Sequence, residues 1–450
     1  MTAPKRSSLF PRSFRKHYPT AVRGEGVFIW DQQGKKYVDF ASSAVVNFIG
    51  HGVRAVHEAM AAQAHSLEFV HSSQFVSEAA EGFAAELLDF LGAAYRDAAV
   101  FFTSGGSEAV ESALKLARQY QVETGSTARH EIISRRQSYH GATLGAMAVS
   151  GNVKRKAIYG PMLKEFAQVG IPYCYRCKYG CNECARRYAE ELDQVLSERA
   201  GNVAAFIYEP VSGATLGAAA PPGGYLRQAH EACAGRGVLT IADEVMTGMG
   251  RTGRALATQH AGVTPDIVVL AKGLSSGYAP LGAVVAGRKV VDAIANGSGV
   301  LVHGFTYSGH PTSAAAGRAV LKVIREERLV EAADDQGSGP ATHLKHSLTR
   351  LRELECVGDV RGIGLMWALE FVKDRATKEP FPSALDFAGK VAQACMERGV
   401  VVYPMQGCVD GYQGDHVMIA PPAVISDAEI DFAIEQVTKA ITQAGNSVRQ

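Results

Sequence analysis

Short and nearly continuous apolar runs recur along the middle of the chain and alternate with stretches of helical periodicity. Runs of this length and polarity are typical of parallel strands that helices cover on both faces. The stretches between them are long enough to be the crossover helices that parallel strands need. The runs occupy residues 98–103, 131–135, 203–208, 238–242, 266–271 and 281–287. We therefore expect a large α/β domain around a mostly parallel sheet.

Both ends of the chain have a different pattern. Residues 27–40 contain two apolar runs on either side of a polar turn, which predicts a hairpin. Beyond about residue 312 helical periodicity dominates, but two strand-like runs, 364–371 and 399–404, precede a closing helix near 426–444. We expect these segments to form a smaller α+β domain built from both ends of the chain.

The predicted division has three parts. An N-terminal arm and part of the small domain take residues 1–70, the large domain takes 71–325, and the C-terminal small domain takes 326–450. A chain of 450 residues is long enough to bury more than one hydrophobic core.

Charge and hydropathy restrict the partners and the location. The 46 Lys and Arg nearly balance the 45 Asp and Glu, which gives no support to nucleic acid or an anionic membrane as the main partner. No stretch approaches the roughly 20 apolar residues that span a bilayer. The basic N-terminus lacks the apolar core of a secretory signal, so it is either an organelle transit peptide or a plain arm. With mostly scattered cysteines, this favours a cytoplasmic protein.

Three ionisable residues, Glu209, Asp243 and Lys272, each stand directly after one of the predicted strands. Parallel α/β sheets bind ligands beyond the carboxyl ends of their strands, so we expect these side chains at one crevice. Each acid taken alone has a simpler explanation, because acids at strand ends often cap the next helix. The three together are more informative.

A lysine at the end of a buried strand is costly to keep charged. Desolvation and nearby positive charge lower its pKa and make it a nucleophilic amine, which suits Schiff-base chemistry. An aspartate at the same edge suits a protonated pyridinium nitrogen, which turns such a ring into an electron sink. Lys272 and Asp243 therefore form a candidate catalytic pair.

A glycine-rich turn precedes a predicted helix that begins near Ser107. Gly105 and Gly106 allow a close approach of the backbone, and the free N–H groups and dipole of the helix favour an anion. The turn is neither a dinucleotide fingerprint nor a Walker loop. A simple helix cap is the alternative to a phosphate site.

These residues lie in motifs that resemble the class III (omega-type) aminotransferases, which are pyridoxal-phosphate (PLP) enzymes of fold type I. The resemblance runs from about residue 25 to 440. Its motifs are FFTSGGSEAVESALKLAR, SYHGAT, YEPVSG, PPGGYL, IADEVMTGMGRTG, PDIVVLAKGLSSGYAPLGAVV and HGFTYSGHP.

The resemblance implies roles for the residues already singled out. Lys272 would carry the cofactor and move the substrate proton, and Asp243 would pair with the pyridine nitrogen. Gly106 and Ser107 would bind the phosphate. These roles agree with the chemistry inferred from the residues themselves.

The resemblance also adds residues that the pattern did not single out. Tyr139 would stack on the cofactor ring and Val245 would pack on the other face, although both could be ordinary core residues. Thr306 would reach the phosphate of the neighbouring subunit, which implies a homodimer or a dimer of dimers with shared sites. Glu209 would line the substrate pocket or brace its wall.

The sequence departs from the family where several members bind substrate carboxylates. Members that act on ornithine, acetylornithine or 4-aminobutyrate carry Arg at the position of Ala142. Many that use 2-oxoglutarate carry Arg at the position of Met418. Met246 stands where several relatives have Gln. Because a guanidinium holds a carboxylate best, we expect an ω-amino acid or amine donor with pyruvate as the acceptor.

Four cysteines crowd into one short segment, CYRCKYGCNEC. Two CxxC pairs can supply zinc with four thiolates, but the spacer between the pairs is much shorter than in a usual zinc module. The alternatives are a structural metal site, a redox or disulfide loop, or a merely cysteine-rich surface segment. The residues concerned are Cys174, Cys177, Cys181 and Cys184.

Other functions remain open at this point. A mutase, racemase or decarboxylase would use the same lysine and aspartate, because the geometry of the bound substrate selects the bond that breaks. A metal-binding protein on an inactive scaffold is supported only by the cysteines. An amine or amino acid and a keto acid are the expected small-molecule partners.

Overall fold

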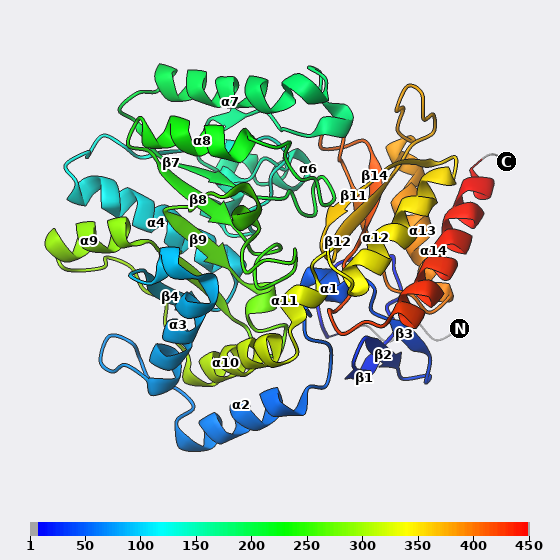
Figure 1. Ribbon diagram of the computed structural model, residues 1–450, viewed down its shortest axis with the longest axis horizontal. Helices are drawn as coiled ribbons and strands as arrows, with labels where there is room; N and C mark the ends of the chain where they lie inside the picture. The colour runs from blue at the N-terminus through cyan, green and yellow to red at the C-terminus, as the bar shows by residue number, and fades with distance from the viewer. Residues whose placement is uncertain (1–7, 449–450) are drawn as a thin grey trace.

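The computed structural model describes residues 8–448, and its central feature is a seven-stranded sheet (Figure 1). The predicted transit peptide or arm lies partly outside the described residues. The strands lie in the order β4 (Ala99–Thr103), β10 (Gly282–Ala286), β9 (Ile267–Leu270), β8 (Leu239–Asp243), β7 (Val203–Tyr208), β5 (Glu131–Arg135) and β6 (Gln168–Val169). All six predicted runs are strands of this sheet, which confirms the α/β architecture.

Helices cover both faces of the sheet, as the apolar runs predicted. Alternate residues of β9 show why the run is apolar throughout: Val268 and Leu270 belong to one core, and Ile267 and Val269 belong to another. The covering helices include α3 (Glu78–Leu91), α4 (Gly106–Glu123), α5 (Leu144–Val149), α7 (Cys181–Glu198), α8 (Tyr225–Ala234), α9 (Arg288–Asn296) and α10 (Pro311–Glu326).

Strand β10 corrects the expectation that the apolar runs are parallel. It runs antiparallel to both neighbours, β4 and β9, whereas β9, β8, β7, β5 and β6 are mutually parallel. The connection between β9 and β10 contains only a short 3-10 turn, Lys272–Leu274, and no crossover helix, so the chain returns in the opposite direction. The apolar pattern reports burial on both faces but not strand direction.

The remaining strands form two smaller antiparallel sheets. The predicted hairpin is β2 (Phe28–Asp31) and β3 (Lys36–Val38), joined by β1 (Ala21–Glu25). The other sheet has the order β11 (Val357–Ile363), β12 (Met366–Phe371), β14 (Asp415–Ile419) and β13 (Tyr403–Gln406). Its helices are α12 (Pro340–Arg350), α13 (Phe387–Glu397) and α14 (Asp427–Ser447), the predicted closing helix.

Both ends of the chain meet at this smaller part, on the right in Figure 1. The predicted run 399–404 is a strand only at its end, because β13 begins at Tyr403. Val400 instead forms an isolated parallel bridge to Val38 of the N-terminal hairpin. Segments from the two ends of the chain are thus paired with each other in this smaller part.

The division into domains remains a proposal. The helix α2 (Arg54–Ser66) packs against α10. We therefore propose that residues 1–70 give their strands to the small domain and α2 to the large one, with boundaries near residues 70 and 325. Three short helices complete the structure: α1 (Ser42–Val45), α6 (Val153–Lys156) and α11 (Leu329–Ala332).

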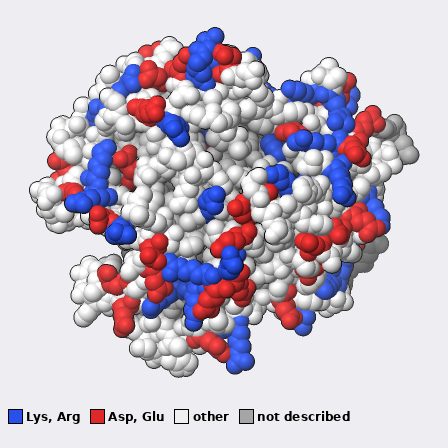
Figure 2. Space-filling model, viewed as in Figure 1, with Lys and Arg blue, Asp and Glu red and all other residues white. Residues whose placement is uncertain are grey.

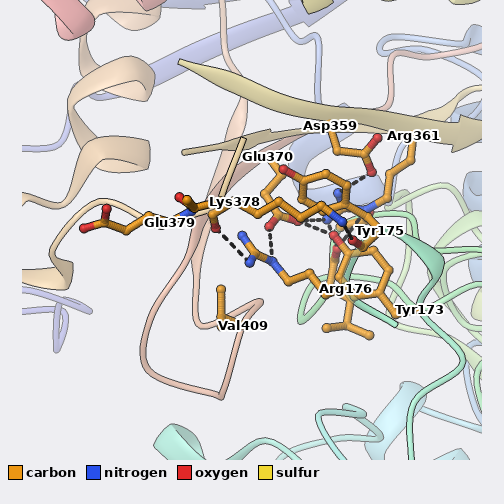
Figure 3. Close-up of polar contacts among 12 residues, drawn as sticks. Tyr173, Tyr175, Arg176, Asp359, Arg361, Glu370, Lys378, Glu379 and Val409 are labelled. Carbon is orange, nitrogen blue, oxygen red and sulfur yellow. Dashed lines mark hydrogen bonds and ion pairs between the residues drawn. The ribbon is translucent and has the colours of Figure 1, made fainter. Parts of the chain in front are cut away.

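A buried polar network joins the segment before α7 to the small sheet (Figure 3). The carboxylate of Glu370 on β12 lies 2.8 Å from the Arg361 guanidinium and 2.7 Å from that of Arg176, and it accepts a hydrogen bond from the Tyr173 hydroxyl. Arg361 also donates to the Gly217 carbonyl at 2.7 Å. Burial alone would raise the pKa of Glu370, but the two guanidinium groups hold it below its usual range.

The surface carries both signs of charge, and Figure 2 shows them interspersed over one face of the molecule. Within residues 8–448, none of the helices combines the length and apolar character needed to cross a bilayer.

Candidate active site

A cavity of about 330 Å³ lies where strands β7, β8 and β9 end and helix α4 begins. Ligand pockets in proteins start at about this size. The parallel register puts Tyr208 beside Ala242, so the residues that follow each strand emerge at one edge. Glu209, Asp243 and Lys272 all line the cavity, which is the convergence that the sequence predicted.

Lys272 follows β9 in a strained backbone conformation. Its φ of +48° is in the left-handed region that non-glycine residues rarely adopt, and such strain clusters at functional sites. Burial lowers the pKa of the Lys272 amine to about 8, although the carboxylates of Asp243 and Glu209 act in the opposite direction. An amine with this pKa is partly neutral, and therefore nucleophilic, near neutral pH.

Asp243 is the last residue of β8 and is buried. Its Oδ2 lies 2.7 Å from Nδ1 of His140, and its Oδ1 accepts a hydrogen bond from the backbone N–H of Val245 at 3.1 Å. The other ring nitrogen of His140 is buried and has no hydrogen-bond partner among the described residues. The aspartate is thus held in place on one side and faces the cavity on the other.

Glu209 braces the wall of the cavity. One carboxylate oxygen accepts from the Gly213 N–H at 3.0 Å and the other from the Tyr139 N–H at 3.3 Å. Burial raises the pKa of Glu209. Glu209 therefore both lines the cavity and braces its wall.

The N-terminus of α4 also lines the cavity. Helix α4 begins at Gly106, and the N–H groups of its first turn lack helical partners. A Cβ on Gly106 would lie 3.3 Å from the γ carbons of Val245, so the backbone and this side chain are in tight contact. The Ser107 hydroxyl accepts a hydrogen bond from the Ala142 N–H at 3.0 Å. Backbone N–H groups and a fixed hydroxyl form a site suited to a phosphate.

Comparison with known proteins agrees with this geometry. The family model described as Aminotransferase class-III matches residues 11–441. An uncharacterized aminotransferase of Bacillus subtilis strain 168, YodT, is 38% identical and aligns over 96% of this chain and 97% of its own length. The chain belongs to the class III aminotransferases.

Solved structures resemble this aminotransferase over nearly its whole length. A thermostable (S)-enantioselective omega-transaminase from Thermomicrobium roseum is 37% identical, with a TM-score of 0.89 and coverage of 97% of this chain and 96% of its own. An amine transaminase from an uncultivated Pseudomonas species, solved in a PLP-bound form, is 33% identical, with a TM-score of 0.89 and coverage of 99% of each chain. These matches establish fold type I.

The cavity of this class III aminotransferase fits the PLP on which its family depends. The cavity is lined by a lysine with a lowered pKa, a buried carboxylate and a helix N-terminus that begins at a glycine. Tyr139 and Val245 also line it. An aromatic ring and a branched aliphatic side chain suit the two faces of a planar ring.

Thr306 is the predicted site residue that the structure does not bring to this cavity. It is exposed on the loop before α10 and is not among the residues that line the cavity of its own chain. This placement is compatible with a role in the site of a second subunit.

The two positions that lack arginine differ in their surroundings. Ala142 is exposed, next to the Ser107 hydroxyl. Met418 on β14 is fully buried in an apolar cluster that includes Val211, and Met246 packs against it. Because Val211 and Met246 also line the cavity, this aminotransferase presents an apolar wall in that direction.

The cysteine segment lies apart from the cavity, at a 3-10 turn (Cys174–Arg176) and the start of α7. Burial, followed by the contact with the Cys181 thiol, raises the pKa of Cys174, whereas the contact with the Cys184 thiol acts in the opposite direction. Among the described residues no group of three or more His, Cys, Asp or Glu is arranged to hold a metal. The structural-metal, redox and surface-segment alternatives for these cysteines therefore stay predictions.

Two residues at the site escaped the sequence analysis. His140 lies inside the quoted motif SYHGAT, directly after Tyr139, but the pattern gave no reason to pair it with a carboxylate 103 residues away. Arg155 lies with its guanidinium carbon 4.4 Å from the centre of the Tyr139 ring. The only available signal for Arg155 was the basic run KRK, which resembles an ordinary solvated helix.

Proposed function

We propose that this aminotransferase moves the amino group of an ω-amino acid or amine to a keto acid, with pyruvate as the acceptor. PLP, when bound, supplies an electron sink that stabilises negative charge on the substrate carbon. The observation that supports the choice of substrates is the apolar wall of Val211 and Met246, packed with the buried Met418, where users of 2-oxoglutarate would carry a guanidinium.

Lys272 and Asp243 would have different roles in the reaction. Lys272 would hold the cofactor through its amine and, once released from it, carry the proton that leaves the substrate carbon. Its pKa of about 8 suits an amine that must both accept and donate a proton near neutral pH. Asp243, steadied by His140, would keep the ring nitrogen protonated.

Other residues would position the cofactor. Gly106 and Ser107 would bind the phosphate at the start of α4, and Tyr139 and Val245 would enclose the ring. Glu209 would fix the wall beside Tyr139 through the backbone hydrogen bond described above.

A second subunit would complete the site. Thr306 is exposed, and large apolar side chains near it, Val302 and Tyr307, are 77% and 59% exposed. Burial of such side chains against a second copy would be favourable. We therefore propose a homodimer with shared sites. We also propose a cytoplasmic location, where the free cysteines of this segment would stay reduced.

A panel of donors tests the substrate choice. Purified protein with PLP is assayed with ω-amino acids and simple amines, each against pyruvate and against 2-oxoglutarate. We expect a higher kcat/KM with pyruvate. A clear preference for 2-oxoglutarate would overturn this proposal, and turnover without any keto acid would indicate a mutase, racemase or decarboxylase.

A further inference from the structure

The arginine side chains near the cavity differ in whether their guanidinium groups already donate hydrogen bonds to backbone carbonyls. Arg251 is buried and donates to the Pro421 carbonyl at 2.5 Å, among other backbone oxygens. Arg135 is buried and donates to the Glu209 carbonyl. The N–H groups that make these contacts are not available to a substrate, and the Nε of Arg135 is buried without a hydrogen-bond partner among the described residues.

Arg155 on the short helix α6 is different. Its guanidinium carbon is 4.4 Å from the centre of the Tyr139 ring, and Tyr139 lines the cavity. Arg155 is half-buried and forms no ion pair with any residue between 8 and 448. Its neighbours are occupied, because Lys154 donates to the Gln406 side chain at 3.2 Å and Lys156 donates to the Ala148 carbonyl at 3.0 Å.

The charge of Arg155 is felt inside the cavity. It is one of the two guanidinium groups that add to burial in lowering the pKa of Lys272; Arg251 is the other. A guanidinium stacked on an aromatic face keeps its N–H edge available, and that edge matches a carboxylate with two parallel hydrogen bonds. Such a pair is favourable beside a partly desolvated cavity, where screening by water is weak.

We propose that Arg155 binds the substrate carboxylate, in place of the arginines that this chain lacks at positions 142 and 418. This inference rests on the proposed function and narrows it. The amino donor and the keto acid would bind one after the other, and each would place its carboxylate on Arg155. This requires substrates with one carboxylate, as an ω-amino acid and pyruvate have. A dicarboxylate such as 2-oxoglutarate would leave its second carboxylate against the apolar wall.

The test compares two donors that differ only at the far end, 4-aminobutyrate and butylamine. In Arg155→Gln, the kcat/KM for 4-aminobutyrate is expected to fall about 10- to 100-fold, mainly through KM, and that for butylamine to stay within about 2-fold. Arg155→Lys keeps the charge but loses the pair of parallel hydrogen bonds, so its kcat/KM for 4-aminobutyrate should lie between those of the unaltered protein and Arg155→Gln. Lys154→Gln is the control, because Lys154 is the neighbouring residue and donates to the Gln406 side chain instead. This variant should leave kcat/KM unchanged for both donors.

Calorimetric titration with butyrate provides a readout without turnover. Its Kd should rise at least about 10-fold in Arg155→Gln and remain unchanged in Lys154→Gln. Equal losses for both donors would mean that Arg155 merely supports Tyr139, and no loss for either would also overturn the inference. If the unaltered protein transferred nothing from either donor, the proposed function would fail, and the butyrate titration would still decide the role of Arg155.

Discussion

The central residue of the site, Lys272, combines a strained backbone with a desolvated amine. Burial lowers its pKa to about 8 against the pull of two carboxylates, so desolvation is the larger effect. A non-glycine residue at a φ of +48° carries backbone strain. Such strain is typical of positions that are fixed by function rather than by stability.

The reactivity of Lys272 should therefore follow pH in a way that other lysines do not. Below its pKa the amine is protonated and unreactive, and above it the amine is neutral. In cofactor-free protein, labelling of Lys272 by an acylating reagent should be half-maximal near pH 8, whereas exposed lysines should follow their ordinary pKa of about 10.4. Peptide mass spectrometry across a pH series measures both at once. A half-point for Lys272 above pH 10 would contradict this account.

At the residue scale, the sequence predicted those site residues whose position follows from the end of a single strand. Glu209, Asp243 and Lys272 converge because each lies at or just beyond the carboxyl end of a strand in the same parallel part of the sheet. His140 and Arg155 could not be predicted, because their roles depend on contacts across the fold. The 2.7 Å contact between His140 and Asp243 joins a loop to the end of β8, and no local pattern relates the two.

At the scale of elements, the start of α4 depends on a turn from elsewhere in the chain. Gly141 has a φ of +142°, and a Cβ there would lie 2.7 Å from the Ser107 hydroxyl and 2.9 Å from the Ala146 Cβ. Only glycine lets this turn approach the proposed phosphate site so closely.

Gly141→Ala should therefore displace Ser107 and weaken PLP retention on the order of 10-fold or more, because both strain and a clash must be relieved. Equilibrium dialysis against PLP, followed by absorbance, measures the change. Gly160→Ala is the matched control, since a Cβ there would meet nothing within 4 Å. Equal affinities for the two variants would show that the turn does not set the phosphate site.

The elements themselves were predictable as far as burial determines them. The apolar runs identified six of the seven strands of the large sheet, because a strand covered on both faces must be apolar throughout. The direction of β10 and the two-residue edge strand β6 were not predictable from that pattern. Both depend on connections and pairing rather than on burial.

At the scale of the whole molecule, the network around Glu370 ties the small sheet to the segment before α7 and to the turn at Gly217. Two guanidinium groups and a tyrosine surround one buried carboxylate (Figure 3). Removal of the Glu370 charge would leave the Arg176 guanidinium without its carboxylate partner and Arg361 with Asp359 alone, at 3.0 Å.

Glu370→Gln should lower the free energy of unfolding by about 3–5 kcal/mol at neutral pH. Since the pKa of Glu370 is held below its usual value of 4.5, this stabilisation is complete above that value and is lost as the pH falls through the lower, folded pKa. The difference from the unaltered protein in urea unfolding should thus shrink in acid. Glu379→Gln, in an exposed ion pair with Lys373, should cost about 1 kcal/mol or less.

The proposed dimer makes a prediction about mixed subunits. Lys272→Ala and Thr306→Asp should each be inactive alone, the first without its amine and the second with a charge that repels phosphate. After denaturation and refolding together, mixed dimers should regain activity, because one of their two sites has an intact Lys272 and receives an intact Thr306 from the other subunit. If Thr306 acted within its own chain, mixing would restore nothing.

The antiparallel placement of β10 has a consequence for how the protein is made. Strand β4 leads directly into the glycine turn, yet its sole partner in the sheet is β10, which the ribosome completes about 180 residues later. Contacts so distant in sequence form late. The nascent chain therefore cannot acquire a finished cofactor cradle until most of the polypeptide has emerged, and a chain truncated before residue 282 should bind no PLP.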